Sequence, residues 1–208
     1  MSEPFVHRFV PGETSAPVLL LLHGTGGTEN DLLDLGHSLL PQAALLSPRG
    51  KILENGMPRF FRRLAEGVFD EPDLIHRTHE LADFIQSAQT DYSLAGRPVI
   101  AVGYSNGANI AASLFLLRPE ILAGAVLLRA MVPLEPEILP KLDRPAIFLA
   151  GGKRDPIIPP ENTQRLATLL QRAGAEVTLH WTNGGHELHS EEIAAAKSWL
   201  ATSFPTTI

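Results

Sequence analysis

Six short apolar runs alternate with amphipathic stretches along the chain, and this order limits the fold more than any other feature of the sequence. The runs are APVLLLLH, AALLSP, RPVIAVGY, LAGAVLLRA, RPAIFLAGG and AEVTLHW. They show little of the alternation expected of a sheet with one solvated face. Helices are predicted between them over 29–40, 72–88, 106–117, 161–173 and 190–203. The pattern indicates βαβ units and a mostly parallel sheet with helices on both faces.

The 208 residues suit one α/β domain over 1–208, built on a central sheet of about seven strands. The segment FVHRFVPG near the start alternates, which is typical of an edge strand. Residues 51–70 contain glycine, proline and paired aromatics without clean periodicity, so a long, irregular and functional loop is predicted there. Few residues separate the run ending near Met131 from the one beginning near Ala146, and no lid domain is expected.

Composition excludes several classes of function. The chain is 44% hydrophobic and 19% charged, as in soluble globular proteins, and its net charge of −6 argues against nucleic acid as a partner. It has no cysteine, which excludes disulfides, thiolate nucleophiles and cysteine metal sites. No secretory signal is recognised, and the longest apolar run, residues 121–128, is too short to span a bilayer. We therefore expect no stable membrane insertion and a cytoplasmic location.

The run VIAVGYSNGANIAASLFLL places one serine between two glycines, where a predicted strand turns directly into a predicted helix. Such a corner exposes a nucleophilic hydroxyl above the sheet, and the glycines at 103 and 107 remove side chains that would collide across it. Ser105 is therefore the predicted nucleophile, with an ordinary turn serine as the alternative.

A serine nucleophile needs a base that is itself held by a carboxylate. His186 follows the last predicted strand on a glycine-containing turn, and Asp155 follows the preceding strand within GGKRDPIIPP. Serine, acid and histidine then occur in the chain order typical of one large class of hydrolases. Glu135 and Glu137 remain weaker alternatives for the acid.

The run LLLLHGTGGTENDL passes from a strand through a glycine-rich loop into a predicted helix. Such loops expose backbone N–H groups, and we predict that the amides of Thr25 and Asn106 form an oxyanion hole. The loop lacks the last glycine of a dinucleotide fingerprint. His23, at the strand end, is interpreted as a brace for the loop rather than a catalyst.

The remaining candidates concern the substrate pocket and metal binding. Met57, Phe60, Phe61 and Met131 are predicted apolar contacts, with burial in the core as the alternative for each. His76 and His79 are three residues apart on a predicted helix, but no third ligand lies nearby, so they are interpreted as surface residues. No metal or organic cofactor is expected.

The motifs HGTGG, GYSNGA, RDPIIP and GGHEL together resemble the small phospholipase/carboxylesterase family of the α/β-hydrolase superfamily, which is similar in layout to dienelactone hydrolases and acyl-protein thioesterases. The resemblance covers nearly the whole chain and implies a cofactor-free serine hydrolase of esters or thioesters. It implies Ser105, Asp155 and His186 as the triad and Thr25 and Asn106 as the oxyanion hole. Two features depart from these relatives: no cysteine nucleophile is present, and LLRAMVPLEP differs from the thioesterase loop.

The function predicted from the sequence is hydrolysis of small or short-chain carboxylic esters through an acyl-enzyme. Thioesterase or lysophospholipase activity and a non-catalytic ligand-binding role are the alternatives. The expected partner is a small-molecule ester, and a homodimer is left open.

Overall fold

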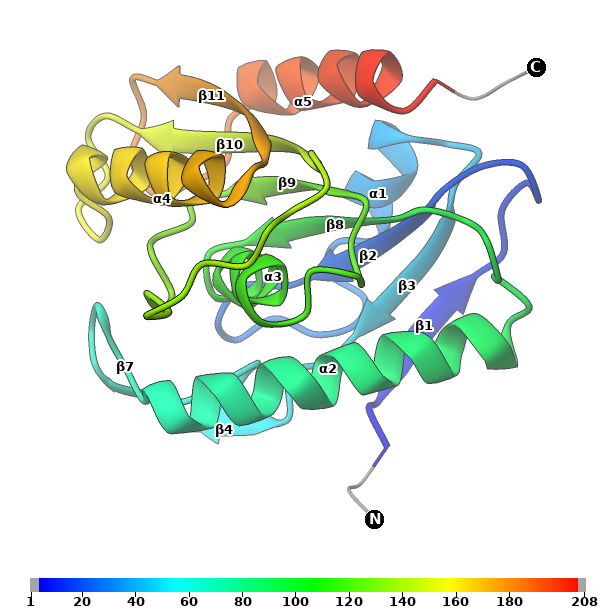
Figure 1. Ribbon diagram of the computed structural model, residues 1–208, viewed down its shortest axis with the longest axis horizontal. Helices are drawn as coiled ribbons and strands as arrows, with labels where there is room; N and C mark the ends of the chain where they lie inside the picture. Colours follow the sequence, from blue (N-terminus) through cyan, green and yellow to red (C-terminus); the bar gives the residue numbers. More distant parts are fainter. Residues whose placement is uncertain (1–3, 206–208) are drawn as a thin grey trace.

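A seven-stranded sheet runs through the centre of the computed structural model, which describes residues 4–205 (Figure 1). The strand order is β1-β3-β2-β8-β9-β10-β11, and every neighbouring pair is parallel except β1 with β3. The strands are β1 (His7–Val10), β2 (Val18–Leu22), β3 (Ala44–Pro48), β8 (Val99–Tyr104), β9 (Gly124–Leu128), β10 (Ala146–Gly152) and β11 (Glu176–Thr182). The predictions of a mostly parallel sheet and of an edge strand near the start of the chain are confirmed, and the structure adds that this edge strand, β1, is antiparallel to β3.

Five helices cover the two faces of this sheet, as predicted. Helices α2 (Glu71–Asp91), α3 (Asn106–Leu117) and α4 (Pro160–Ala173) pack on one face, and α1 (Leu33–Leu39) and α5 (Ser190–Ser203) pack on the other (Figure 1). Among the described residues, no helix has the length and apolarity that a membrane crossing requires.

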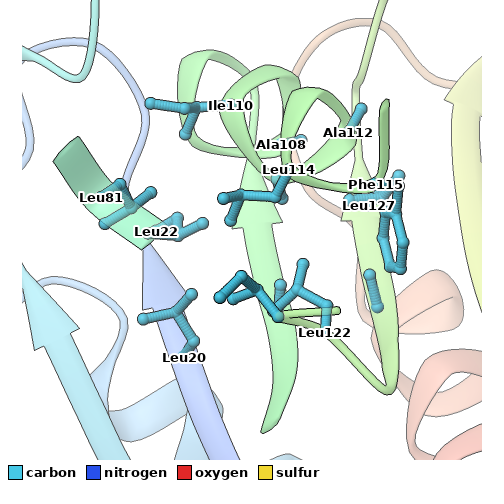
Figure 2. Packing of buried hydrophobic residues seen from close by; sticks show 14 of the residues in the cluster. Leu20, Leu22, Leu81, Ala108, Ile110, Ala112, Leu114, Phe115, Leu122 and Leu127 are labelled. Carbon is cyan, nitrogen blue, oxygen red and sulfur yellow. The ribbon is translucent and has the colours of Figure 1, made fainter. Parts of the chain in front are cut away.

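The β2 strand illustrates why the apolar runs do not alternate. Leu20 and Leu22 belong to the core under α2 and α3, whereas Leu19 and Leu21 belong to the core under α1 and α5. Since successive side chains of a strand point to opposite faces, burial of both faces requires apolar residues at every position. In Figure 2, Leu22 appears beside Leu81 of α2 and Leu20 appears further along β2, and all three belong to the cluster that includes Leu114 of α3.

The predicted irregular loop at 51–70 is instead two small hairpins. Strand β4 (Ile52–Glu54) pairs with β5 (Met57–Arg59), and β6 (Arg63–Ala65) pairs with β7 (Val68–Phe69). The first turn is Asn55-Gly56, whose φ angles are 52° and 80°. Asn-Gly is the favoured pair for a two-residue hairpin because both residues tolerate positive φ. The sequence carried this turn signal, so the prediction of an irregular loop was wrong.

Two of the five predicted helices differ from their predicted bounds by more than one residue. The helix predicted over 29–40 begins only at Leu33, because the residues before it form turns in which Thr28 Oγ1 donates to Asp31 at 2.7 Å. The helix predicted over 72–88 extends to Glu71–Asp91, with the Asp70 side chain accepting from the N–H of Asp73 as its N-cap. The other three predictions agree with α3, α4 and α5 to within one residue.

Candidate active site

Ser105 lies between the end of β8 and the start of α3, in a backbone conformation that is rare for a residue with a side chain. Its φ and ψ are 51° and −114°. A Cβ on Gly103 would lie 2.7 Å from the backbone of Ala108, and one on Gly107 would overlap the carbonyl group of Leu22. Strand and helix approach this closely only because both positions are glycine, which places the serine on a tight corner above the sheet.

His186 and Asp155 form a continuous hydrogen-bonded chain with Ser105. Nε2 of His186 lies 2.9 Å from Ser105 Oγ, and Nδ1 lies 2.8 Å from Asp155 Oδ2. A carboxylate can only accept, so Nδ1 carries the proton and Nε2 accepts from the serine hydroxyl. This is the tautomer that a general base for serine requires.

Asp155 is held on a loop after β10 and is only 8% exposed. Its Oδ1 accepts from the N–H groups of Ile157 and Ile158 at 2.8 and 3.1 Å. These bonds occupy one carboxylate oxygen and leave Oδ2 directed at the imidazole. The carboxylate that contacts His186 is therefore that of Asp155, and not that of Glu135 or Glu137, the alternatives considered from the sequence. Glu135 instead pairs with Arg165.

Thr25 and Asn106 line the same cleft as Ser105 and His186. Within the described residues, neither of their backbone N–H groups takes part in a backbone hydrogen bond. Thr25 belongs to the loop after β2, and Asn106 is the first residue of α3, where the N–H groups of a helix have no internal partner. Both donors are therefore free to meet a developing negative charge in the cleft.

Strand β5 and the residue after it connect these two donors. Gly26 N–H donates to the carbonyl of Pro58 at 2.9 Å, and Arg59 Nη1 donates to Thr25 Oγ1 at 2.6 Å. The N–H of Phe60 donates to Asn106 Oδ1 at 2.7 Å. Residues 58–60 thus hold the Thr25 loop and the start of α3 in a fixed relation.

The buried side chain of His23 supports the loop that carries Thr25. The residue is 2% exposed, Nδ1 lies 2.6 Å from the carbonyl oxygen of Gly24, and Nε2 accepts from the N–H of Gly50 at 3.0 Å. Burial lowers the pKa of His23, against the opposing hydrogen bond to Gly24, so the neutral ring is favoured. The imidazole joins the loop after β2 to the chain after β3. This contact agrees with the interpretation of His23 as a brace for its loop.

The cleft beside Ser105 has a volume of about 220 Å³. Its wall combines apolar side chains with two arginines. Arg59 and Arg63 both contact one carboxylate, that of Glu54, at 3.2 and 2.9 Å. Burial lowers the pKa of Arg59, repulsion from Arg63 lowers it further, and Glu54 opposes both effects. The lining residues are Thr25, Arg59, Arg63, Glu66, Gly67, Phe69, Tyr104, Ser105, Asn106, Asn109, Met131, Ile157, Ile158 and His186.

The four residues predicted to form the pocket lie in different places. Met131 lines the cleft. Phe60 and Phe61 are 2% and 0% exposed and belong to the hydrophobic core, which was the alternative given for them. Met57 is 39% exposed on β5 and does not line the cleft. The hairpins present Arg59, Arg63 and Phe69 to the cleft instead, and only the unusual composition of residues 51–70 pointed to them.

A second, larger cavity of about 630 Å³ lies beside α4, around Trp181 and Arg165. Of the residues considered for the site, Glu135, a weaker alternative for the acid, lines this cavity, but Ser105, Asp155, His186, Thr25 and Asn106 do not. Across residues 4–205, no group of three or more His, Cys, Asp or Glu residues is arranged to hold a metal ion. The cleft beside Ser105 is therefore the candidate active site.

Comparison with known proteins places this geometry in context. The family model described as Phospholipase/Carboxylesterase matches residues 8–204, a range that includes all five residues predicted to act in catalysis. The MhqD protein of Bacillus subtilis (strain 168), a putative hydrolase by name, is 50% identical over 186 residues, which is 89% of this chain and 93% of that protein.

Two solved structures are similar over almost their whole length. The carboxylesterase of Bacillus cereus superposes with a TM-score of 0.94 at 50% identity, covering 96% of this chain and 95% of that one. YahD, in a structure with malic acid, superposes with a TM-score of 0.91 at 33% identity, covering 96% and 99%.

Proposed function

Because the chain belongs to the phospholipase/carboxylesterase family, has the α/β-hydrolase fold and is a carboxylesterase-type hydrolase, we propose that it cleaves carboxylic esters through an acyl-enzyme on Ser105. One observation carries the proposal: the hydrogen-bonded chain from Ser105 Oγ through His186 to Asp155, at 2.9 and 2.8 Å. These three residues come from loops after three strands and meet at one edge of the sheet.

In the acylation step, Ser105 Oγ attacks the ester carbonyl carbon while its proton passes to His186 Nε2. Asp155 stabilises the imidazolium that forms. The carbonyl oxygen becomes an oxyanion, which accepts hydrogen bonds from the backbone N–H groups of Thr25 and Asn106. The bond to the alcohol oxygen then breaks as Nε2 returns the proton to that oxygen, and the alcohol leaves.

Deacylation repeats these steps with water as the nucleophile. His186 Nε2 accepts a proton from water, the hydroxide oxygen attacks the acyl carbon, and the same two amides receive the second oxyanion. The proton returns to Ser105 Oγ as its bond to the acyl carbon breaks. The products are a carboxylic acid and free enzyme.

The cleft volume supports a small substrate. Pockets for drug-sized ligands measure roughly 300–1,000 Å³, whereas the cleft beside Ser105 measures about 220 Å³. We therefore propose short acyl or small aryl esters. A series of nitrophenyl esters should give its highest kcat/KM at short acyl chains, and a maximum at long chains would contradict this proposal.

The arginines favour a second candidate, an ester that carries a carboxylate. Arg59 and Arg63 share Glu54, so one positive charge is left over at the inner wall, although the exposed Glu66 also lines the cleft. The related YahD structure contains malic acid, a small dicarboxylate. This candidate predicts that a hemisuccinate monoester is cleaved with a lower KM than its neutral methyl-capped analogue. Arg63→Gln should remove the difference.

The decisive experiment is covalent labelling with a fluorophosphonate probe. We expect the protein to be labelled and Ser105→Ala to lose both labelling and activity, with kcat lowered by at least about 10⁴-fold. Ser198→Ala, an exposed serine on α5, is the matched control and should behave as the parent protein. Absence of labelling in the parent protein would favour the non-catalytic ligand-binding alternative.

Other activities are separated by the choice of substrate. Matched oxygen and sulfur esters distinguish an esterase from a thioesterase, and a lysophospholipid tests the lysophospholipase alternative. A cytoplasmic location and a small-molecule ester as the partner stay predictions from the sequence, which leaves a homodimer open.

A further inference from the structure

Arg129 follows β9 and is completely buried, in a position that the proposed mechanism does not use. Its side chain is 0% exposed, and its φ is 57°, which is rare for a residue with a side chain. Its guanidinium forms a two-pronged ion pair with Glu192 of α5, which is also 0% exposed, at 2.5 and 2.8 Å. The arginine belongs to the LLRAM stretch that differs from the thioesterase loop.

The other hydrogen bonds of Arg129 include two to the backbone on either side of His186. Nε donates to the carbonyl of Gly185 at 2.8 Å, and Nη2 donates to the carbonyl of Glu187 at 2.7 Å. No residue from Asn183 to Ser190 is fully buried, and the segment contains two glycines. Packing alone therefore fixes this loop poorly, and the guanidinium supplies directed contacts on either side of the base.

The same strand end also holds the nucleophile. Ser105 N–H donates to the carbonyl of Leu128 at 2.9 Å, and the N–H of Arg129 donates to the carbonyl of Ala150 at 2.9 Å. Two consecutive residues therefore make these contacts: Leu128 contacts the backbone of Ser105, and Arg129 contacts the loop that carries His186. This arrangement relates the position of the hydroxyl directly to that of the imidazole.

Stability alone is a poor reason for such a pair. Burying two charges costs solvation energy, and apolar side chains of similar volume often give an equally stable protein. What apolar residues cannot supply is a set of donors directed at two particular carbonyl groups. The rigid planar fork of arginine does this, and the point charge of lysine cannot reproduce its geometry.

We propose that Arg129, fixed by Glu192, is a positioning residue that holds the His186 loop so that Nε2 stays within hydrogen-bond distance of Ser105. The inference rests on the proposed function, because His186 is there the general base. A shift of about 1 Å in such a group can lower the rate by about 10²-fold. Arg129 does not line the cleft, whose wall includes hairpin residues and Met131, so we expect substrate binding to be little affected.

The test is Arg129→Lys, which keeps the charge and removes the fork. We expect kcat on a short-chain nitrophenyl ester to fall by about 10- to 100-fold while KM changes less than about twofold. The far-downfield proton resonance of the His186 Nδ1–H···Asp155 hydrogen bond should shift or broaden. This signature does not depend on turnover, and a purely structural role of Arg129 would leave it unchanged.

Arg97→Lys is the matched control. Arg97 also donates to two backbone carbonyls, those of Ala16 and Pro17, at 2.7 and 3.2 Å, but it lies before β8, at the opposite end of that strand from Ser105. The Arg97→Lys protein should be less stable than the parent protein, but its kcat and its His186 Nδ1–H resonance should be unchanged. If Arg129→Lys does not fold, Glu192→Gln provides the test, because glutamine can still accept from His189 N–H but no longer fixes the guanidinium by charge.

The outcomes separate the two proposals. A folded Arg129→Lys protein with the parent kcat and an unchanged resonance overturns the positioning role, as does an equal loss of kcat in Arg97→Lys. A parent protein that shows the resonance but neither labelling nor ester hydrolysis overturns the proposed function alone. In that case, the change in the resonance still decides the role of Arg129.

Discussion

Gly107 of α3 lies backbone against backbone with Leu22 of β2, so closely that a Cβ on the glycine would overlap the Leu22 carbonyl group. Gly107, two residues after Ser105, is therefore required by the packing of α3 on β2, the strand next to β8. Its lack of a side chain thus serves the helix–strand contact as well as the tight turn at Ser105.

Gly107→Ala should accordingly destabilise the protein severely, by more than about 3 kcal/mol, because two backbone segments must separate. Gly96→Ala is the control: Gly96 has a φ of 77°, but a Cβ added there would meet nothing within 4 Å, so only backbone strain of about 1 kcal/mol is expected. Urea unfolding of both variants measures the difference. Equal losses would contradict the packing argument.

Asp155→Asn should lower kcat by about 10³- to 10⁴-fold with little change in KM. The N–H groups of Ile157 and Ile158 already donate to one side-chain oxygen, so they would keep the asparagine oxygen and turn its NH₂ group toward His186. A donor there stabilises the wrong imidazole tautomer. Steady-state kinetics with a short-chain nitrophenyl ester provide the measurement.

Asp143→Asn is the control for this change, because Asp143 precedes β10 and so lies at the opposite end of that strand from Asp155. It should keep the parent kcat. An Asp155→Asn protein within tenfold of the parent kcat would assign the acid elsewhere.

Thr25→Val tests the brace on the proposed oxyanion hole. Valine keeps the backbone N–H and the shape of the side chain but removes the Oγ1 acceptor for Arg59, whose bond is 2.6 Å long. We expect kcat to fall by about tenfold, less than the 10²- to 10³-fold typical of losing an oxyanion donor itself. Thr90→Val, on the exposed side of α2, should have no effect on kcat. A rise in KM with unchanged kcat would assign Thr25 to substrate binding instead.

His23 should make stability depend on pH. Its ordinary pKa of 6.5 applies to the unfolded chain, and burial lowers its pKa in the folded protein. Between the lowered value and 6.5, the unfolded chain binds more protons, so the free energy of unfolding falls as pH decreases through this window. Protonation of Nε2 would also remove the acceptor for Gly50 N–H.

His23→Gln removes this titration and should flatten the dependence of unfolding free energy on pH between about 7.5 and 5.5. The exposed His76 of α2 supplies the control variant, His76→Gln, which should keep the slope of the parent protein. Chemical denaturation across this range gives both slopes, and equal slopes for His23→Gln and the parent would rule out the brace as the source.

The sheet and the triad candidates were predictable because they depend on local signals. Continuous apolar runs identify the strands buried on both faces, and Ser105 and Asp155 follow two of them, β8 and β10. His186 follows the edge strand β11, which is mostly exposed or half-buried but ends at a turn signal, Asn183-Gly184-Gly185. Since parallel strands end at the same edge, their order alone brings these residues close together.

The wall of the cleft was not predictable in the same way. Phe60 and the neighbouring Arg59 are adjacent in sequence, yet one lies in the core and the other lines the cleft. Which of two neighbours turns inward depends on the register of a short hairpin, which its turn at Asn55-Gly56 sets. The partners of Arg129 depend on contacts between segments more than 50 residues apart, which no local pattern reveals.

The hydrogen bonds of residues 58–60 have a consequence for redesign by loop grafting. Hairpin β4–β5 together with Phe60, the residue after it, carries both part of the cleft wall and the contacts to Thr25 and Asn106. Exchanging this segment for a relative's would therefore alter selectivity and turnover together. Hairpin β6–β7 also lines the cleft, but within the described chain it makes no hydrogen bond to Thr25 or Asn106. Substitutions in hairpin β6–β7 should therefore change which substrates the cleft accepts while leaving the backbone donors of Thr25 and Asn106 in place.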